Sequence, residues 1–277
     1  MPCVGATTVR STALGALILA IAACGGDGSA DDVNGAPGTS GRVDPAAECP
    51  TEGEEWEVAK LYIEHNATDE DTGVHGFFGG EAWSVLCLTD PNGTMILIAD
   101  PLEQFDRLAV SDLFFESREP PNDELPIDRI RDDFPDGDYT VAGIDVEGTP
   151  RVGTATFTHA IPAPPTIITP DLVADAEEAE PPAVPPSGLR VEWEAVSDTI
   201  DGAPVTITGY EVIVTDEEAD DPDGFARPEY DVHVPADQRS LTVPDDFLRA
   251  DRLYELEVLA IEETGNQTIA VGFFTTE

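Results

Sequence analysis

Carboxylates are the most abundant reactive groups in this sequence, and one segment spaces them as ligands of a cation. In the segment 65–75, Asp69 and Asp71 alternate ahead of Gly73. Ca²⁺ takes roughly six to eight hard oxygen ligands, which alternating carboxylates in a loop supply. The segment therefore predicts a calcium site at Asp69 and Asp71. The alternative is an acidic loop that contacts only solvent.

A second acidic segment, Asp220–Gly224, is the other candidate cation loop. Neither segment completes the EF-hand pattern, which ends in a bidentate glutamate. Carboxylate pairs elsewhere do not indicate glycoside hydrolysis, because 57 acidic residues in 277 make such pairs common by chance.

The usual catalytic signatures are absent from the sequence. It contains no GxSxG, HExxH or SxxK motif and no glycine-rich phosphate loop. The four histidines, His65, His75, His159 and His233, are scattered, and His233 is expected to be exposed or in an ion pair. We therefore predict a non-catalytic protein and keep a hydrolase with an unrecognised site as the alternative.

The charge balance disfavours two classes of partner. Acidic residues number 57 and basic residues 13, with Lys60 the only lysine, so the formal net charge is −44. Such a surface repels nucleic-acid phosphates and anionic lipid headgroups. Cations, basic proteins and neutral glycans stay compatible as partners. The alternative is a solvated, salt-tolerant surface with no dedicated ligand.

The N-terminus has the pattern of an export signal. Arg10 supplies a positive charge, and the apolar run 13–23 is shorter than the about 20 residues of a membrane-spanning helix. The run leads into Ile21-Ala-Ala-Cys24, which resembles the lipobox of bacterial lipoproteins. The resemblance implies that residues 1–23 are removed and that Cys24 carries the lipid. The alternative is an ordinary secretory signal cleaved at the same place.

An acyl anchor at Cys24 would hold the protein on the outside of a membrane. Each buried methylene contributes about 0.8 kcal/mol, so several acyl chains anchor stably. The residue after the cysteine is Gly25 and not aspartate. By resemblance to the sorting rule of Gram-negative lipoproteins, the absence of aspartate here favours the outer membrane over the inner membrane. Residues 24–48 are rich in Gly, Asp and small residues. This composition predicts a flexible tether of roughly 25–30 Å.

Cys49 and Cys87 are the cysteines that remain after export and lipidation, since Cys3 leaves with the signal. In an oxidising compartment this even pair predicts a disulfide, which would tie the start of the first domain to the strand 83–88. Two unpaired thiols, with Cys87 in the core, are the alternative. A metal site is disfavoured, because there is no CxxC spacing and no histidine beside either cysteine.

The segment 164–277 alternates apolar and polar residues in short runs between turns, which predicts β-strands. Its Trp193, Tyr210, Leu248 and Tyr254 stand at the spacing of core positions in fibronectin type III domains, which the segment resembles. The resemblance implies a two-sheet sandwich with a buried tryptophan and a tyrosine corner. All four residues are therefore expected in the core.

The segment 49–163 shows the same alternation and predicts a second, immunoglobulin-like β-sandwich. An Asn-Gly pair indicates a hairpin turn, and one segment has two isoleucines on a shared helical face. The predicted elements are strands at 56–65, 83–88, 95–99, 110–117 and 151–159, the turn at 90–93, a helix at 125–134 and a tyrosine corner at 134–141.

Together these features predict an all-β protein of two tandem sandwiches behind a signal peptide and a tether. The anchor, the spacer and the loops at the ends of rigid domains favour a binding or adhesion module displayed on the cell envelope. Its expected partners are the membrane, through the lipid, and an envelope protein or a glycan. A structural scaffold lipoprotein of an envelope complex is the alternative, which fold class alone does not separate.

The anchor can be tested by replacing Cys24 with serine. We expect Cys24→Ser to move the protein from the membrane to the soluble fraction, because serine has no thiol to alkylate. Palmitate labelling and cell fractionation measure this. Unchanged palmitate labelling in the variant would contradict lipidation at Cys24.

Overall fold

The computed structural model describes residues 49–220 and 227–277, and within them the protein is all-β, which confirms the predicted fold class. The export signal, Cys24, the tether and most of the acidic segment Asp220–Gly224 lie outside the described residues. No helix in the described part of the chain has the length and apolar character needed to cross a membrane.

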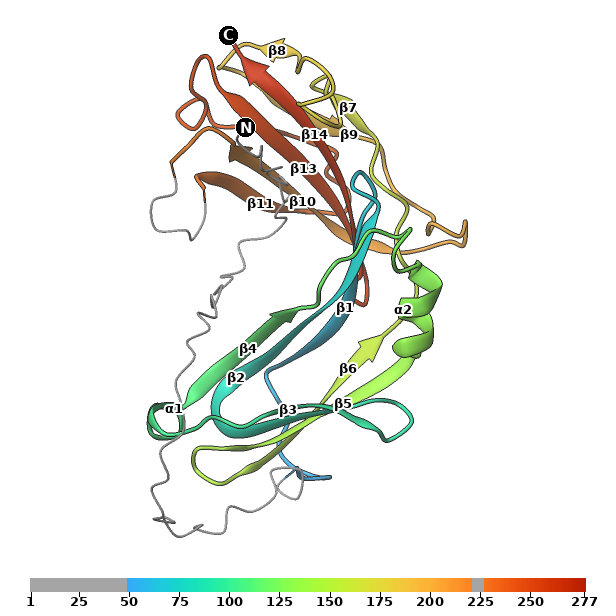
Figure 1. Ribbon diagram of the computed structural model, residues 1–277, viewed down its shortest axis with the longest axis vertical. Coiled ribbons are helices and arrows are strands. Elements are labelled where there is room, and N and C mark those ends of the chain that lie inside the picture. The colour runs from blue at the N-terminus through green and yellow to red at the C-terminus, as the bar shows by residue number, and fades with distance from the viewer. Residues whose placement is uncertain (1–48, 221–226) are drawn as a thin grey trace, which may run out of the picture.

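The C-terminal half is a sandwich of a three-stranded and a four-stranded layer (Figure 1). This is the arrangement that the fibronectin type III resemblance implied. The acidic segment 171–186 is tied to the sandwich, because Val173 bridges to Phe273 and β8 pairs with the end of β14. The layers are β7 (Ile167–Thr169), β9 (Arg190–Trp193) and β12 (Ser240–Thr242) against β11 (Glu229–Pro235), β10 (Ile207–Asp216), β13 (Leu253–Glu262) and β14 (Gln267–Thr276), with β8 (Ala183–Val184) at the edge.

The core of this sandwich contains the four residues expected there. Trp193, Tyr210 and Tyr254 are completely buried and Leu248 is 6% exposed. The Tyr210 hydroxyl accepts the backbone N–H of Val196 at 2.9 Å, so the polar tip of the buried ring has a partner. The Tyr254 hydroxyl likewise accepts a backbone N–H, from the segment just upstream, at 2.8 Å. The tyrosine corner that the resemblance implied therefore forms.

The N-terminal half is built around one long, bent strand. The first part of β2 pairs with β1 and β4, and its second part pairs with β3 and β5. The ladder is interrupted between Gly79 and Trp83, where Gly80 has φ +112°. The elements are β1 (Val58–Asn66), β2 (Asp71–Thr89), β3 (Met95–Ala99), α1 (Gln104–Leu108), β4 (Val110–Glu116), α2 (Ile127–Asp133), β5 (Gly137–Asp145) and β6 (Pro150–Phe157).

This half has its own core and a disulfide. Trp56, Phe78, Trp83 and other apolar residues form a buried cluster, and α2 adds Ile130 to it. The predicted disulfide between Cys49 and Cys87 is present. The predicted helix at 125–134 is present as the shorter α2.

The second predicted tyrosine corner also forms. The Tyr139 hydroxyl donates to the carbonyl of Pro135 at 3.1 Å, and the Tyr139 ring is completely buried. The two halves therefore share a structural motif: the hydroxyl of a buried tyrosine is hydrogen-bonded to the turn that precedes the tyrosine's own strand.

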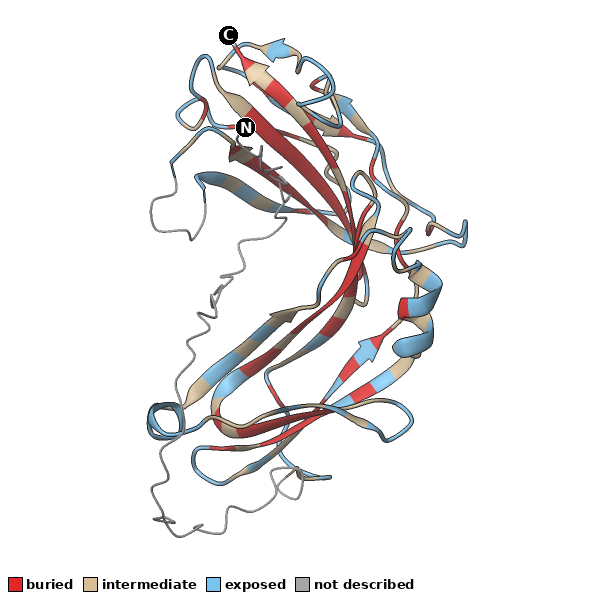
Figure 2. Ribbon diagram, viewed as in Figure 1, coloured by how far each residue is buried: buried red, intermediate tan, exposed pale blue. Residues whose placement is uncertain are grey.

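One sheet runs through both halves, which the sequence did not predict. β1 pairs in parallel with β14, with Glu64 opposite Gln267 and Asn66 opposite Ile269, so that eleven strands form a single sheet. In Figure 1 the molecule bends at this seam, and β4 and β11 border the inside of the bend. Buried residues run through the seam along β13, β14 and β1 (Figure 2). The domain boundary between residues 163 and 164 stays a prediction.

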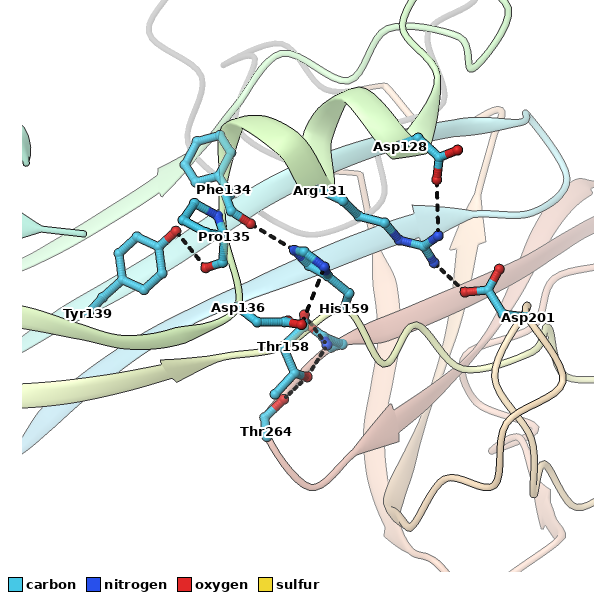
Figure 3. A network of polar contacts seen from close by, with 11 residues as sticks. Asp128, Arg131, Phe134, Pro135, Asp136, Tyr139, Thr158, His159, Asp201 and Thr264 are labelled. Atoms are coloured by element: carbon cyan, nitrogen blue, oxygen red, sulfur yellow. Dashed lines mark hydrogen bonds and ion pairs between the residues drawn. The ribbon is translucent and has the colours of Figure 1, made fainter. Parts of the chain in front are cut away.

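Side chains reinforce the seam. The completely buried Asn266 accepts the backbone N–H of Ile63 at 2.8 Å and donates to the carbonyl and the hydroxyl of Thr158, each at 3.0 Å. Beside it, Thr158 bonds Thr264 and Arg131 on α2 pairs with Asp201 (Figure 3). The seam is therefore held by a parallel ladder and by side-chain hydrogen bonds and an ion pair that cross it.

The seam can be tested by replacing Asn266 with alanine. We expect Asn266→Ala to lower the free energy of unfolding by about 2–4 kcal/mol, because it leaves a buried N–H and a buried carbonyl without partners. Asn92→Ala, in the exposed turn between β2 and β3, is the control and should change it by less than about 0.5 kcal/mol. Chemical denaturation measures both. Equal effects of the two variants would contradict this account of the seam.

Candidate functional site

The long sheet has one face turned toward the two cores and one face turned away from them. Side chains alternate along each strand, so residues paired across strands share a face. We call the face turned away from the cores the acidic face. Its members include Asp112, Phe114 and Glu116 on β4, His75 on β2, Lys60, Tyr62 and Glu64 on β1, Gln267 on β14, Glu255 and Glu257 on β13, Glu211 on β10, and Glu229, Asp231 and His233 on β11.

A histidine between two carboxylates lies on this face beside the seam. His75 is completely buried, and its Nε2 lies 3.0 Å from Oε1 of Glu119, in the segment after β4. On the other side of the ring, Nδ1 lies 3.8 Å from Oε2 of Glu64. The Gln267 side chain donates to the same Glu64 oxygen. The group thus joins β1, β2, β14 and the segment after β4.

Aromatic rings enclose the histidine. The Tyr62 ring centroid lies 5.3 Å from that of His75, and the Phe114 ring meets the imidazole edge-on at 6.1 Å. Burial raises the pKa of Glu64 to about 7, although His75 acts in the opposite direction. Burial lowers the pKa of His75, but the hydrogen bond that its Nε2 donates to Glu119 and the charge of Glu64 outweigh burial, so the pKa is raised overall.

More glutamates on the acidic face are buried beyond the seam. Alternation predicts that Glu255 and Glu257 face away from the core, and they do, but they are only 7% and 2% exposed. The Oε1 atom of Glu257 is buried without a hydrogen-bond partner. Burial raises the pKa of Glu255, Glu257 and Glu211, and the neighbouring acidic groups raise it further. The face therefore has several carboxyl groups that resist ionisation.

A second cluster stands at the far edge of the acidic face. Glu211, Asp231 and His233 each offer a ligand atom, and these atoms lie within 4.8 Å of one another. His233 is 67% exposed and pairs with Glu211 at 3.2 Å, as the sequence predicted for this histidine. Solvent reaches two of the three groups, so this cluster is a weaker candidate for a specific site.

The predicted calcium residues lie at a tight hairpin between β1 and β2. Asp69 accepts the side-chain amide of Asn66 at 3.0 Å, and Asp71 opens β2 opposite Asn66. Burial and the charges of Glu119 and Asp69 raise the pKa of Asp71 to about 7. Neither aspartate belongs to the two clusters of metal-ligating groups found in the described residues. Calcium binding at Asp69 and Asp71 stays a prediction.

Sequence reasoning missed the histidine cluster. His75 is one of four histidines scattered along the sequence, and Glu119 is 44 residues away from it. The available signal was local: Tyr62, Glu64 and His75 are polar or aromatic residues at alternate positions of strands that otherwise contribute to a core. Only the pairing of β1, β2 and β14 brings them to one place.

Comparison with known proteins gives distant fold neighbours only. No family model and no curated protein matches this chain. A two-domain fibronectin type III segment of chicken tenascin matches with a TM-score of 0.29 and 9% identity, over 79% of this chain and 99% of that one. The chicken CNTN1 FN1–FN3 domains match with a TM-score of 0.31 and 11% identity, over 81% and 70%.

A bacterial protein is also among these neighbours. A 1.5-MDa bacterial ice-binding adhesin matches with a TM-score of 0.24 and 17% identity, over 81% of this chain and 65% of that one. At such scores no residue role passes from these proteins to this chain.

The buried carboxyl groups predict how stability depends on pH. In the folded state their pKa values lie above the usual 4.5, so the folded protein binds more protons than the unfolded chain between about pH 4.5 and 8. Stability must therefore fall as the pH rises through this range. We expect a loss on the order of a few kcal/mol between about pH 5 and pH 8, measured by denaturation at each pH.

A matched pair of variants isolates this effect. Glu257→Gln should raise the stability at about pH 8 and change it little at about pH 5, because it removes a buried group that must ionise. Glu263→Gln, in the exposed turn after β13, removes the same charge and should have little effect at either pH. Parallel pH profiles for the wild type and Glu257→Gln would contradict the assignment.

Proposed function

We propose that this protein is a non-catalytic, lipid-anchored binding module of the cell envelope, and that its acidic face binds a basic segment of a partner protein. The observation that carries the proposal is the single sheet through both halves, which turns two domains into one continuous face. Carboxylates on β4, β13, β10 and β11 share that face.

Charge determines the class of partner. The chain has 57 acidic and 13 basic residues, and among the described residues the positive or titratable cationic groups on the face are Lys60, His75 and His233. The exposed acids Asp112, Glu229 and Asp231 stand at the margins of the face. Complementary charge raises association rates and rejects acidic partners. A basic polypeptide forms ion pairs with these acidic groups, whereas nucleic acid and anionic lipid are repelled by them.

The fold supports binding rather than catalysis. The acidic face has apolar residues between the charges: Phe114 is exposed, whereas a cluster on β10, β13 and β14 is buried. Aromatic and aliphatic side chains surrounded by charges are typical of protein-binding surfaces. An acyl anchor at Cys24 and the tether 24–48 would present this surface away from the lipid.

A pair of charge variants tests the proposal. Asp112→Asn with Asp231→Asn removes two charges from the acidic face, and Asp132→Asn with Asp237→Asn removes two exposed charges elsewhere. With a lysine-rich peptide as probe, we expect the first pair to weaken binding about three- to tenfold and the second pair to have a smaller effect. Fluorescence anisotropy at low salt measures both.

The partner itself would be sought by cross-linking in envelope preparations. A stoichiometric protein contacting the acidic face supports the proposal. Equal weakening of peptide binding by both pairs of variants would show that only net charge matters, and it would overturn the assignment to this face.

A further inference from the structure

We propose that Glu64, His75 and Glu119 form a binding site for one divalent transition-metal ion of the Zn²⁺ type at the seam between the two halves. This site goes beyond the proposed partner binding and does not depend on it. The argument rests on the ligand geometry, on an unsatisfied histidine nitrogen and on the charge enclosed.

The three residues are placed closely enough to share an ion. Each offers one ligand atom, and these atoms lie within 4.8 Å of one another. Zn²⁺ binds nitrogen and oxygen ligands at about 2.0–2.2 Å, which separates ligands around a tetrahedral ion by ~3.3–3.5 Å. The three atoms therefore have to approach one another by at most about 1.5 Å to surround an ion. Three protein ligands with one position left for water is a known zinc arrangement.

The imidazole of His75 gives an independent indication of a ligand. Its Nδ1 is completely buried and has no hydrogen-bond partner, although it faces Oε2 of Glu64 at 3.8 Å. A buried polar atom without a partner costs about 1–3 kcal/mol. A separation of 3.8 Å is too long for a hydrogen bond, but it exceeds the separation of two ligands around a tetrahedral zinc ion, ~3.3–3.5 Å, by only a few tenths of an ångström.

Neighbouring groups hold the ligands as outer-shell groups do in metal sites. The Gln267 side chain donates to Glu64, which fixes this carboxylate on the sheet. Ligating histidines commonly keep a carboxylate on the other ring nitrogen, which sets the tautomer. The two ring nitrogens of His75 face one carboxylate each, Nδ1 that of Glu64 and Nε2 that of Glu119, so the imidazole is oriented between the two acidic ligands.

Charge also favours a divalent ion. Binding of an ion requires both carboxylates to be ionised and the imidazole to be neutral, so the bound site supplies two negative charges at a place where Glu64 and His75 are 2% and 0% exposed. A divalent ion neutralises both charges. A mixed imidazole and carboxylate set suits Zn²⁺ and its neighbours better than Ca²⁺, which requires more oxygen ligands than this site supplies.

The test is a calorimetric titration of the full chain with Zn²⁺ after treatment with EDTA. Excess Ca²⁺ in the buffer occupies the acidic surface. We expect one saturable Zn²⁺ site, with binding at least about tenfold weaker in His75→Gln and in Glu119→Gln. His233→Gln, in the second cluster, should bind as the wild type does. Zn²⁺ should also raise the melting temperature of the wild type but not of His75→Gln.

Two further measurements test the metal site without relying on His75→Gln. Glu119 is 22% exposed, so Glu119→Gln tests the site even where the buried His75→Gln unfolds the protein. Co²⁺ in place of Zn²⁺ gives a visible absorption band that reports its ligands and should disappear in Glu119→Gln. Absence of a saturable site, equal Zn²⁺ affinity in Glu119→Gln, or loss of binding only in His233→Gln would each overturn the proposal.

Discussion

The parallel pairing of β1 with β14 is the contact on which the rest of this structure depends. A sandwich normally ends in edge strands with unpaired N–H and carbonyl groups, which are prone to pair with other chains. Here one such edge from each half pairs with the other, and Asn266 of the C-terminal half satisfies polar groups of Ile63 and Thr158 in the N-terminal half. Tandem domains usually move relative to each other, because their interfaces are small and polar. A shared ladder opposes that motion.

The seam also creates the acidic face. Because β1 and β14 lie in register, Glu64 meets Gln267, and His75 follows one strand away. Neither half alone contains the full row of groups from β4 to β11. The proposed partner surface and the proposed metal site are thus consequences of one backbone pairing, although they are separate functions that can fail independently.

Burial gives these charges their properties. Carboxylates in water ionise near pH 4.5, whereas Glu64 has a pKa of about 7 because it is desolvated on the sheet. Proteins retain buried charged groups where function or specificity requires them, since apolar replacements are often as stable. The unpartnered atoms of His75 and Glu257 are therefore the places where a cation or a proton has the most to contribute.

The sequence by itself determined most of the strands, the Asn-Gly turn and the disulfide, because alternation, turn chemistry and cysteine count are local or compositional. The buried Trp193 and the tyrosine corner at Tyr254 followed from the resemblance to fibronectin type III domains, and the corner at Tyr139 from its likeness to the one at Tyr254. The first part of β2, residues 71–82, was not among the predicted strands. Only the tertiary structure decided that the two halves share a sheet and that Glu64, His75 and Glu119 meet. Edge strands pair through backbone N–H and carbonyl groups, which every strand has, so the side-chain types in the sequence did not specify the partner of β1. Glu257 shows the same limit: alternation gave its face correctly, but its burial depends on the surrounding fold.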